Sequence, residues 1–221
     1  LLALIKLYAA DPRDTKIDLG VGVYRDASGA TPVFRAVKKA EMSLLASQDS
    51  KAYLGPEGDM GMVEGLMPYA FGDAVARERL TGIQTPGGTG AVSLACDLLA
   101  SVGIKRVLLG TPSWPNHAPI IKAAGMEVVT YEHGNIDTQT LTFDALIAAL
   151  DGAGKGDAVL LHGCCHNPTG MDYSAEQWVT ITDKVLERGV FPLIDLAYQG
   201  LGAGFDEDAA GMRGLLARVP E

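Results

Sequence analysis

The stretch AVLLHGCCHNPTGMDYSAEQWVTITDKVLERGVFPLIDLA, residues 158–197, decides the fold class of this chain. It begins and ends with a short apolar run, and the segment at 174–189 between them has the hydrophobic spacing of a helix. Fully apolar strands that alternate with helices are typical of parallel sheets covered on both faces. The stretch therefore predicts a strand at 158–163, a helix at 174–189 and a second strand at 191–197.

The alternation of strands and helices continues on both sides of this unit. Apolar runs at 107–110 and 127–132 predict two further strands, and 80–85 has the residues of a third. Residues 17–32 predict a short strand with a glycine-rich turn. Helical spacing also occurs at 1–10, 34–47, 60–75, 91–103, 118–125, 143–153 and 208–219. The predicted fold class is α/β, with a mostly parallel sheet covered by helices on both faces.

Unusual loops follow the predicted strands, and open α/β sheets bind their ligands at these ends. The segment PGGTG, 86–90, lies between a strand-like run and a helix, and the loops 111–117 and 163–170 follow two later strands. Asp195 and Tyr198 lie at the end of the last strand. Because the carboxyl ends of parallel strands meet at one edge of the sheet, we expect these four segments to form one pocket.

The glycine-rich segment has the composition of an anion site. Gly87, Gly88 and Gly90 would let the backbone approach a ligand, Thr89 offers a hydroxyl, and the following helix has free N–H groups at its start. A plain tight turn is the alternative. The dinucleotide pattern G-x-G-x-x-G fails at Ser93, and no acidic residue ends the next strand. A phosphate group therefore fits better than a dinucleotide.

Trp114 and Asn167 each allow two interpretations. Trp114 lies in a loop between Pro112 and Pro115, where it either packs into the core or presents its flat face to an aromatic ligand. Asn167 begins an Asn-Pro-Thr-Gly turn, where it is either a turn residue or an amide that faces a ligand. The residues alone leave both alternatives open.

Two histidines and two cysteines fall within residues 162–166, a composition that suggests zinc. Structural zinc sites use spaced pairs of ligands, whereas Cys164 and Cys165 are adjacent. Neighbouring side chains of an extended chain point to opposite faces, so these two thiols should not converge. We expect no metal site.

Asp195 lies among apolar residues of the last predicted strand and needs a partner. A buried carboxylate is costly unless it meets a cation or several hydrogen-bond donors. A structural arginine is one possible partner. The other is a cationic heterocycle such as pyridoxal phosphate, whose pyridine nitrogen a carboxylate can keep protonated and whose phosphate suits a helix start. Tyr198 is close enough along the chain to line the same pocket.

Composition narrows the class of protein. The 221 residues carry a formal net charge of −9, and no run of Lys or Arg stands out, which argues against binding nucleic acid or anionic membranes. Three cysteines (the third is Cys96) do not form a disulfide framework and fit a reducing, cytoplasmic setting. No apolar run approaches the ~18 residues of a membrane span.

Six segments together resemble the class I aminotransferases, and most closely the aspartate and aromatic aminotransferase group. They are LGVGVYRDASGATPVFRAVKKAE (19–41), YLGPEGD (53–59), QTPGGTGA (84–91), PSWPNH (112–117), HGCCHNPTG (162–170) and IDLAYQG (194–200). The resemblance implies the type I fold of pyridoxal-phosphate enzymes. It also implies a homodimer and ping-pong transfer of an amino group between an aspartate or aromatic amino acid and a 2-oxo acid such as 2-oxoglutarate.

The resemblance assigns roles to the candidate cofactor residues. Gly87, Gly88 and Thr89 would form the phosphate cup. Trp114 would stack on the cofactor ring and reach a substrate carboxylate, and Asn167 would contact the phenolic oxygen and the same carboxylate. Tyr198 would bond the phenolic oxygen, and Asp195 would hold the pyridine nitrogen protonated.

Four further residues receive supporting roles from the resemblance. His117 and His162 would surround Asp195 and the ring, Gly22 would offer its backbone to the substrate, and Tyr53 would reach the phosphate bound by the neighbouring subunit. The prolines at 112 and 168 match positions where the family often has cis peptide bonds. Residues 1–30 would be an N-terminal segment, partly of the small domain and interface, and 31–221 an incomplete large cofactor-binding domain.

One element of the family's pattern has no match in this sequence. The lysine that forms a Schiff base with the cofactor follows the aspartate and tyrosine in a Ser-x-Ser-Lys segment, and no lysine here matches it. We therefore expect this chain to be the N-terminal part of a longer aminotransferase and to be inactive alone. The alternative is a non-catalytic α/β module that binds a cofactor or a partner, and a nucleotide-binding module is disfavoured by the glycine pattern.

Overall fold

The computed structural model describes residues 2–18 and 22–219. The chain divides into two compact units, Leu1–Tyr53 and Leu54–Glu221. The expected boundary between residues 30 and 31 concerns the domains of a whole enzyme and stays a prediction. None of the described helices is long and apolar enough to cross a membrane.

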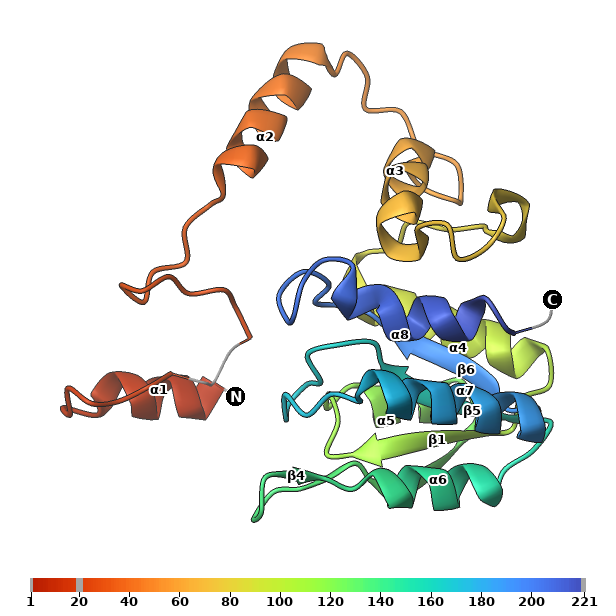
Figure 1. The fold of residues 1–221 in the computed structure, drawn as a ribbon. Helices are drawn as coiled ribbons and strands as arrows, with labels where there is room; N and C mark the ends of the chain where they lie inside the picture. Colours follow the sequence, from red (N-terminus) through yellow and green to blue (C-terminus); the bar gives the residue numbers. More distant parts are fainter. Residues whose placement is uncertain (1, 19–21, 220–221) are drawn as a thin grey trace. The chain divides into compact units, whose positions relative to one another are not determined.

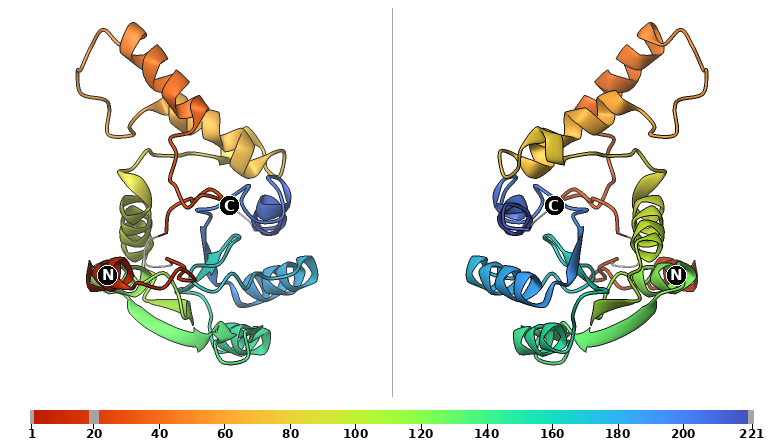
Figure 2. Two further views of the ribbon diagram at one scale, coloured as in Figure 1. Left: turned by 90° about the vertical axis from the view of Figure 1, so that its left-hand side faces the viewer. Right: turned by 90° about the vertical axis from the view of Figure 1, so that its right-hand side faces the viewer.

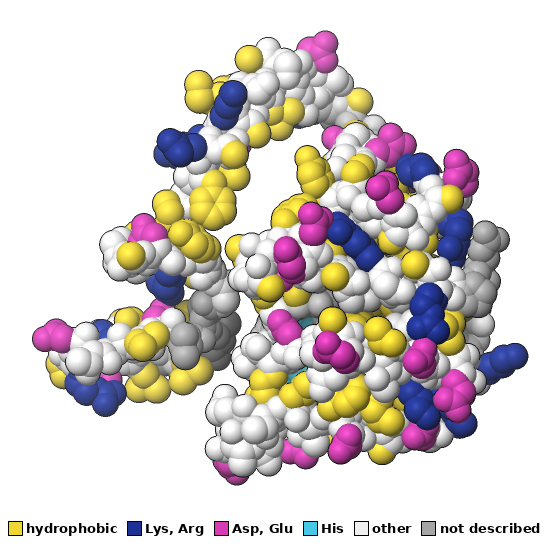
Figure 3. Space-filling model, viewed as in Figure 1, with side chains coloured by type: hydrophobic (Ala, Val, Ile, Leu, Met, Phe, Trp, Pro, Cys, Tyr) yellow, Lys and Arg dark blue, Asp and Glu magenta, His cyan; other side chains and the backbone are white. Residues whose placement is uncertain are grey.

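The first unit contains helices α1 (Leu2–Ala10) and α2 (Arg35–Ser47). Helix α2 buries none of its residues, and apolar side chains are exposed along it and just before it (Figure 3). The strand expected within 17–32 lies partly on residues 19–21, outside the described chain, and none of the described residues there is assigned to a strand. The expected turn is present, because the Asp26 carboxylate accepts hydrogen bonds from the backbone of Ser28 and Ala30.

The second unit is built on a four-stranded parallel sheet with strand order β2-β1-β5-β6 (Figure 1). Its strands are β1 (Arg106–Thr111), β2 (Glu127–Glu132), β5 (Asp157–His162) and β6 (Phe191–Asp195). At the amino ends of β1 and β5, Arg106 donates two hydrogen bonds, of 2.8 and 2.7 Å, to the Asp157 carboxylate. At the carboxyl ends of β5 and β6, His162 and Asp195 are neighbours in the ladder. The sheet thus brings two candidate site residues side by side.

Helices cover both faces of this sheet (Figure 2). One face carries α4 (Gly87–Ser101) and α5 (His117–Ala123). The other carries α6 (Phe143–Asp151), α7 (Ala175–Arg188) and α8 (Glu207–Leu216). The unit also contains α3 (Met60–Phe71), a short 3-10 helix η1 (Arg77–Arg79), and a hairpin of β3 (Gly134–Asn135) and β4 (Thr140–Leu141). The predicted fold class is confirmed.

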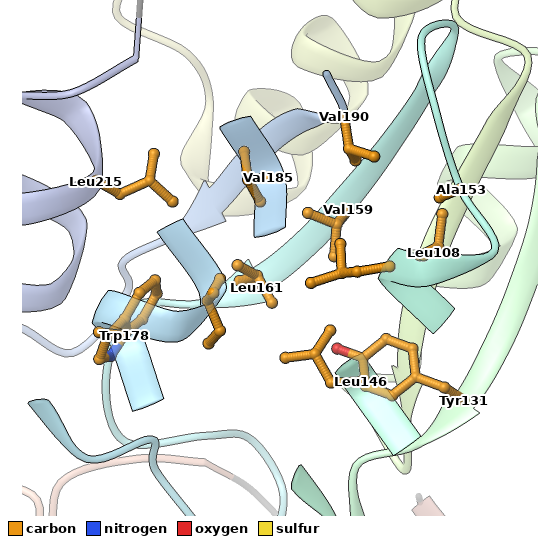
Figure 4. Close-up of a cluster of buried hydrophobic side chains, with 12 residues drawn as sticks. Leu108, Tyr131, Leu146, Ala153, Val159, Leu161, Trp178, Val185, Val190 and Leu215 are labelled. Atoms are coloured by element: carbon orange, nitrogen blue, oxygen red, sulfur yellow. The ribbon is translucent and has the colours of Figure 1, made fainter. Parts of the chain in front are cut away.

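Successive side chains of the inner strands β1 and β5 point to opposite faces of the sheet and pack into two different hydrophobic clusters. Leu108 of β1 and Val159 and Leu161 of β5 pack against α6, α7 and α8, together with Trp178 (Figure 4). Their neighbours Val107, Leu109, Ala158 and Leu160 pack against α4 and α5. This alternation with a period of two is why the strands read as continuous apolar runs in the sequence.

Three expected elements differ from the structure. Residues 80–85 are not a strand, because no strand of the described chain pairs with them, and the backbone N–H of Gln84 bonds to Glu57 instead. Helix α4 begins at Gly87 rather than at 91, so the glycines form its first turn. Helix α3 ends at Phe71 because Gly72 adopts a φ of 53°. Apart from the strand expected within 17–32, the remaining predicted strands and helices lie within a few residues of their expected ranges.

Candidate active site

A cavity of about 170 Å³ lies at the carboxyl ends of β1, β5 and β6, beside the start of α4. Its lining consists of Gly88, Trp114, His162, Asn167, Asp195, Ala197 and Tyr198. All of these except Ala197 were predicted site residues, and His162 was predicted in a supporting role. These residues come from four segments that are far apart in the sequence. The parallel sheet brings them together, since its strands all end at the same edge.

The Asp195 carboxylate is paired with a buried histidine. Nε2–H of His117 donates to Oδ2 of Asp195 at 2.9 Å, and Nδ1 of His117 bonds to the Ser113 hydroxyl at 2.8 Å. The hydrogen bond from His117 holds the pKa of Asp195 below its ordinary value, against the opposing effect of burial. Asp195 therefore stays ionised near neutral pH, and the arginine partner that the sequence allowed is replaced by His117.

Trp114 lines the cavity rather than filling the core alone. Its ring meets the His117 ring edge-on, with centroids 5.0 Å apart and planes at 82°. Across the cavity, the Asn167 amide lies 3.5 Å from the Tyr198 hydroxyl, which is at the limit of a hydrogen bond. The peptide bonds before Pro112 and Pro168 are cis, as the resemblance suggested.

The first turn of helix α4 contains the residues that were predicted to bind an anion. Gly88 lines the cavity, whereas Gly87 and Thr89 lie beside it in the same turn. A Cβ added at Gly87 or Gly88 would meet nothing within 4 Å. This side of the cavity is therefore open to a ligand. The N–H of Gly87 already donates to the Thr85 carbonyl at 2.8 Å, so an anion would be bound by the N–H groups that follow it in the first turn.

All four histidines of the chain form one column of rings. The ring centroids of His117 and His162 lie 5.2 Å apart, those of His162 and His166 4.1 Å apart, and those of His166 and His133 3.6 Å apart. Burial, with the charge of neighbouring histidines, lowers the pKa of His162 to about 4 and that of His166 to about 2. Burial also lowers the pKa of His133. The rings of His133, His162 and His166 are therefore neutral at pH 7.

His162 contains an unsatisfied polar atom. Its Nε2 is buried and has no hydrogen-bond partner among the residues that the structure describes. An atom of this kind is uncommon in folded proteins and often marks a place where a water or ligand binds. His162 also lines the cavity, next to Asp195.

Four residues near the site were not found by sequence reasoning, or were not given a role by it. Ser113 fixes His117, His133 stacks on His166, and the Asp172 carboxylate accepts the backbone N–H groups of Cys165 and His166 at 2.7 and 2.8 Å. Ser113 and His166 lie inside the segments 112–117 and 162–170, where the assigned roles went to their neighbours. The signals for His133 and Asp172 were weak, because an isolated His or Asp outside a motif is common. Their partners are distant in the chain or depend on the loop conformation.

The two adjacent thiols do converge, contrary to expectation. Cys165 has a φ of 46°, so the chain is not extended there, and the sulfurs of Cys164 and Cys165 lie within 4.8 Å of each other and of an Asp208 oxygen. However, the Asp208 oxygens already accept hydrogen bonds from the backbone of residues 200, 202, 203 and 204. In the similar group of His117, His162 and Asp195, both ring nitrogens of His117 are already hydrogen-bonded, to Ser113 and to Asp195. Neither arrangement leaves a free set of ligands for a metal.

Gly22 and Tyr53 belong to the first unit, and both are exposed there. Their expected contacts with a substrate and with the phosphate of another subunit stay predictions. A larger cavity of about 480 Å³ lies between α7 and α8 and contains none of the predicted site residues. Size alone therefore does not identify the site, and the convergence of polar groups does.

Comparison with known proteins gives matches over nearly the whole chain. The family described as aminotransferase class I and II matches residues 14–221. A tyrosine aminotransferase of Rhizobium meliloti (strain 1021) is 57% identical over 221 residues, which are 100% of this chain and 57% of that protein. An aspartate aminotransferase of Escherichia coli (strain K12) is 47% identical over 225 residues, again with 100% of this chain and 57% of the relative covered.

A solved structure shares the fold. An aromatic-amino-acid aminotransferase from Burkholderia pseudomallei, covalently bound to pyridoxal phosphate, has a TM-score of 0.91 and is 38% identical, with 98% of this chain and 55% of the other covered. The chain thus spans about 57% of the length of the curated relatives that it matches. Sequence, fold and the convergence of the motifs agree, and the chain belongs to the class I and II aminotransferases.

Proposed function

We propose that the cavity at the carboxyl ends of β1, β5 and β6 holds pyridoxal phosphate, and that the whole protein transfers amino groups. The observation that carries this proposal is the ionised Asp195 carboxylate, held by His117 in a cavity that Trp114, Asn167 and Tyr198 also line. Class membership and the cofactor of a solved relative support it.

The residues of the cavity fit this cofactor group by group. One oxygen of Asp195 is engaged by His117, and the other has no hydrogen-bond partner among the described residues, so it is free to accept from a protonated pyridine nitrogen. The open first turn of α4 suits the phosphate, and Asn167 and Tyr198 are placed for the phenolic oxygen. When bound, the cofactor supplies an electron sink for charge that develops at the amino acid's Cα.

The covalent attachment point of the cofactor lies outside this set of residues. No lysine is among the described residues that line the cavity. We infer that residues 1–221 hold and polarise the cofactor without supplying the Schiff-base lysine, and that this chain alone does not catalyse transfer. In the whole protein, Asp195 would keep the pyridine nitrogen protonated while His117 holds the carboxylate in place.

The substrates and the setting are part of the same proposal. Relatives named for tyrosine, aspartate and aromatic amino acids all match the chain, which supports an aspartate or aromatic amino acid as amino donor and a 2-oxo acid, 2-oxoglutarate, as acceptor. The exposed Tyr53 and the exposed apolar side chains near α2 support a homodimer. Three free cysteines support a cytoplasmic enzyme of amino-acid metabolism.

A binding experiment on the 221-residue chain tests the cofactor site. Pyridoxine 5′-phosphate lacks the aldehyde and cannot label surface lysines, so isothermal titration with it reports the cavity alone. We expect the chain to bind it, and Asp195→Asn to weaken binding about tenfold or more, because the pyridinium loses its charged partner. The matched control is Asp183→Asn. It makes the same change at an exposed carboxylate of α7, which pairs with Arg218 and does not line the cavity. Failure of the unaltered chain to bind would overturn the proposal.

A kinetic experiment tests the reaction. In a protein that contains these residues at full length, amino transfer from aspartate or tyrosine to 2-oxoglutarate should proceed, and Asp195→Asn should lower kcat/KM about a hundredfold or more. Binding of pyridoxine 5′-phosphate without any transfer by the full-length protein would favour the non-catalytic cofactor-binding module instead.

A further inference from the structure

We propose that His133 is a positioning residue for the cavity: through its stack on His166 and its hydrogen bonds, it holds the turn that presents the Asn167 amide. This inference rests on the proposed function, since Asn167 is taken to face the cofactor. His133 itself does not line the cavity, and no motif of the sequence drew attention to it.

The turn that carries Asn167 is fastened mainly by His166. The backbone N–H of Gly170 donates to the His166 carbonyl at 2.7 Å, and the Thr169 hydroxyl bonds to Nδ1 of His166 at 2.8 Å. The His166 backbone N–H donates in turn to Asp172. Asn167 lies inside this closed turn, so the direction of its side chain depends on where the His166 ring is held.

His133 supplies a flat surface against that ring. The two imidazoles are nearly parallel, at 7°, with centroids 3.6 Å apart, and both side chains are buried. A ring stacked at this distance restricts sliding and tilting of its neighbour, because close-packed interiors leave little room for alternative positions.

Both nitrogens of His133 are fixed as well. Nε2 lies 2.8 Å from the Met171 carbonyl, which can only accept, so Nε2 carries the hydrogen and Nδ1 accepts from the Tyr173 hydroxyl at 3.0 Å. Met171 and Tyr173 flank Asp172, the residue whose carboxylate pins the start of the turn. The His133 ring therefore stacks on His166, at the start of the turn, and hydrogen-bonds to Met171 and Tyr173, which follow the turn.

The backbone of His133 connects this turn to the opposite wall of the cavity. Its N–H donates to the Thr111 carbonyl at 2.9 Å, at the beginning of the loop that carries Ser113 and Trp114. Its own carbonyl accepts from the Thr142 N–H at 2.9 Å. His133 thus has a fixed position relative to β1 and transmits it to the Asn167 turn.

A double-mutant cycle with pyridoxine 5′-phosphate distinguishes positioning from general stabilisation. We expect His133→Ala and Asn167→Ala each to weaken binding by the 221-residue chain about tenfold, the effect of roughly one hydrogen bond. If His133 acts through Asn167, the double variant should bind about as weakly as Asn167→Ala alone. Effects that multiply in the double variant would overturn the inference. His133→Phe, which keeps a ring on His166 but loses both hydrogen bonds, replaces His133→Ala in the cycle if that variant does not fold.

Two further readouts separate the possible failures. Val185→Ala, a buried change on α7 away from the cavity, should leave binding within about twofold even though it lowers stability. Hydrogen exchange of the ligand-free chain should be faster at the N–H groups of His166 and Gly170 in His133→Ala, and unchanged in Val185→Ala. Unchanged exchange in His133→Ala contradicts the inference. If Asn167→Ala weakens binding and His133→Ala does not, the cofactor site stands and only this inference fails. If the unaltered chain does not bind the ligand, the proposed function fails first.

Discussion

His162 holds a neutral imidazole between two other histidine rings at the end of β5. Burial and the neighbouring His117 lower its pKa to about 4, whereas an unfolded histidine has a pKa of about 6.5. The unfolded chain therefore binds this proton more readily, so the free energy of unfolding must fall as the pH falls from about 6.5 to about 4. The contribution is fully present above the unfolded pKa and is lost through this window.

We expect His162→Phe to reduce that loss of stability. Phenylalanine keeps a ring between His117 and His166, removes the unsatisfied Nε2 and cannot be protonated. The fall in the free energy of unfolding between about pH 7 and about pH 4 should shrink by at most ~3 kcal/mol, the equivalent of the pKa difference. Urea unfolding of both chains over this range measures it. A pH dependence equal to that of the unaltered chain would show that His162 does not titrate as described. Any pH dependence that remains in His162→Phe comes from the other groups with lowered pKa values, such as His133, His166 and Asp195.

Residue identities in the site were only partly predictable from the sequence. The sequence placed Asp195, Asn167 and Trp114 at strand ends, and the cavity contains all three. It could not name the partner of Asp195, because His117 is 78 positions away and only the fold brings the two together. The same holds for the stack of His133 on His166, which joins two loops whose packing no local pattern encodes.

At the scale of elements, helix α8 packs against α7 through a glycine. A Cβ added at Gly211 would lie 2.4 Å from the buried Trp178 ring, so the ring or the helix would have to shift. Three residues along the same helix, a Cβ added at Gly214 would meet nothing within 4 Å. The two glycines therefore test packing and helix propensity separately.

We expect Gly211→Ala and Gly214→Ala to change stability in opposite directions. Gly211→Ala should destabilise the chain by about 1–3 kcal/mol, since overpacking outweighs the gain in helix propensity. Gly214→Ala should stabilise it by up to ~1 kcal/mol, because alanine restricts the unfolded chain and strain is absent. The midpoints of urea unfolding of the two variants, compared with that of the unaltered chain, measure these changes in stability. Equal changes in the same direction would contradict this account of the contact between α7 and α8.

Helices and strands were predictable from the sequence where the hydrophobic period and the capping residues agree. They were less predictable where a strand depends on a partner strand elsewhere in the chain. Ser174 and Gln177 form a capping box at the start of α7, and the predicted helix there is confirmed almost to the residue. Residues 80–85 have strand composition but bond instead to residues 57–59, so composition without a partner strand was not enough. The hairpin of β3 and β4 consists of two-residue strands, too short to show a period.

At the scale of the whole molecule, the two units differ in how much they bury. Both hydrophobic core clusters lie in residues 54–221, whereas no described side chain of residues 4–53 is buried. A segment without buried side chains opens at little cost in free energy, and proteases cleave the open form. The second unit contains every residue that lines the candidate cofactor cavity. Cofactor binding should therefore not depend on an intact first unit.

We expect limited trypsin digestion to cut first within residues 1–53, because no described Lys or Arg of that unit is buried. Cleavage after Lys51, the last of these residues, leaves a product that begins at Ala52. Lys184 on α7 should be protected, since that helix packs on the sheet. Mass spectrometry at early times identifies the cuts, and titration of the purified product with pyridoxine 5′-phosphate should give a Kd within about twofold of the intact chain. Early cleavage at Lys184, or loss of binding in the product, would mean that residues 1–53 help to stabilise the cavity after all.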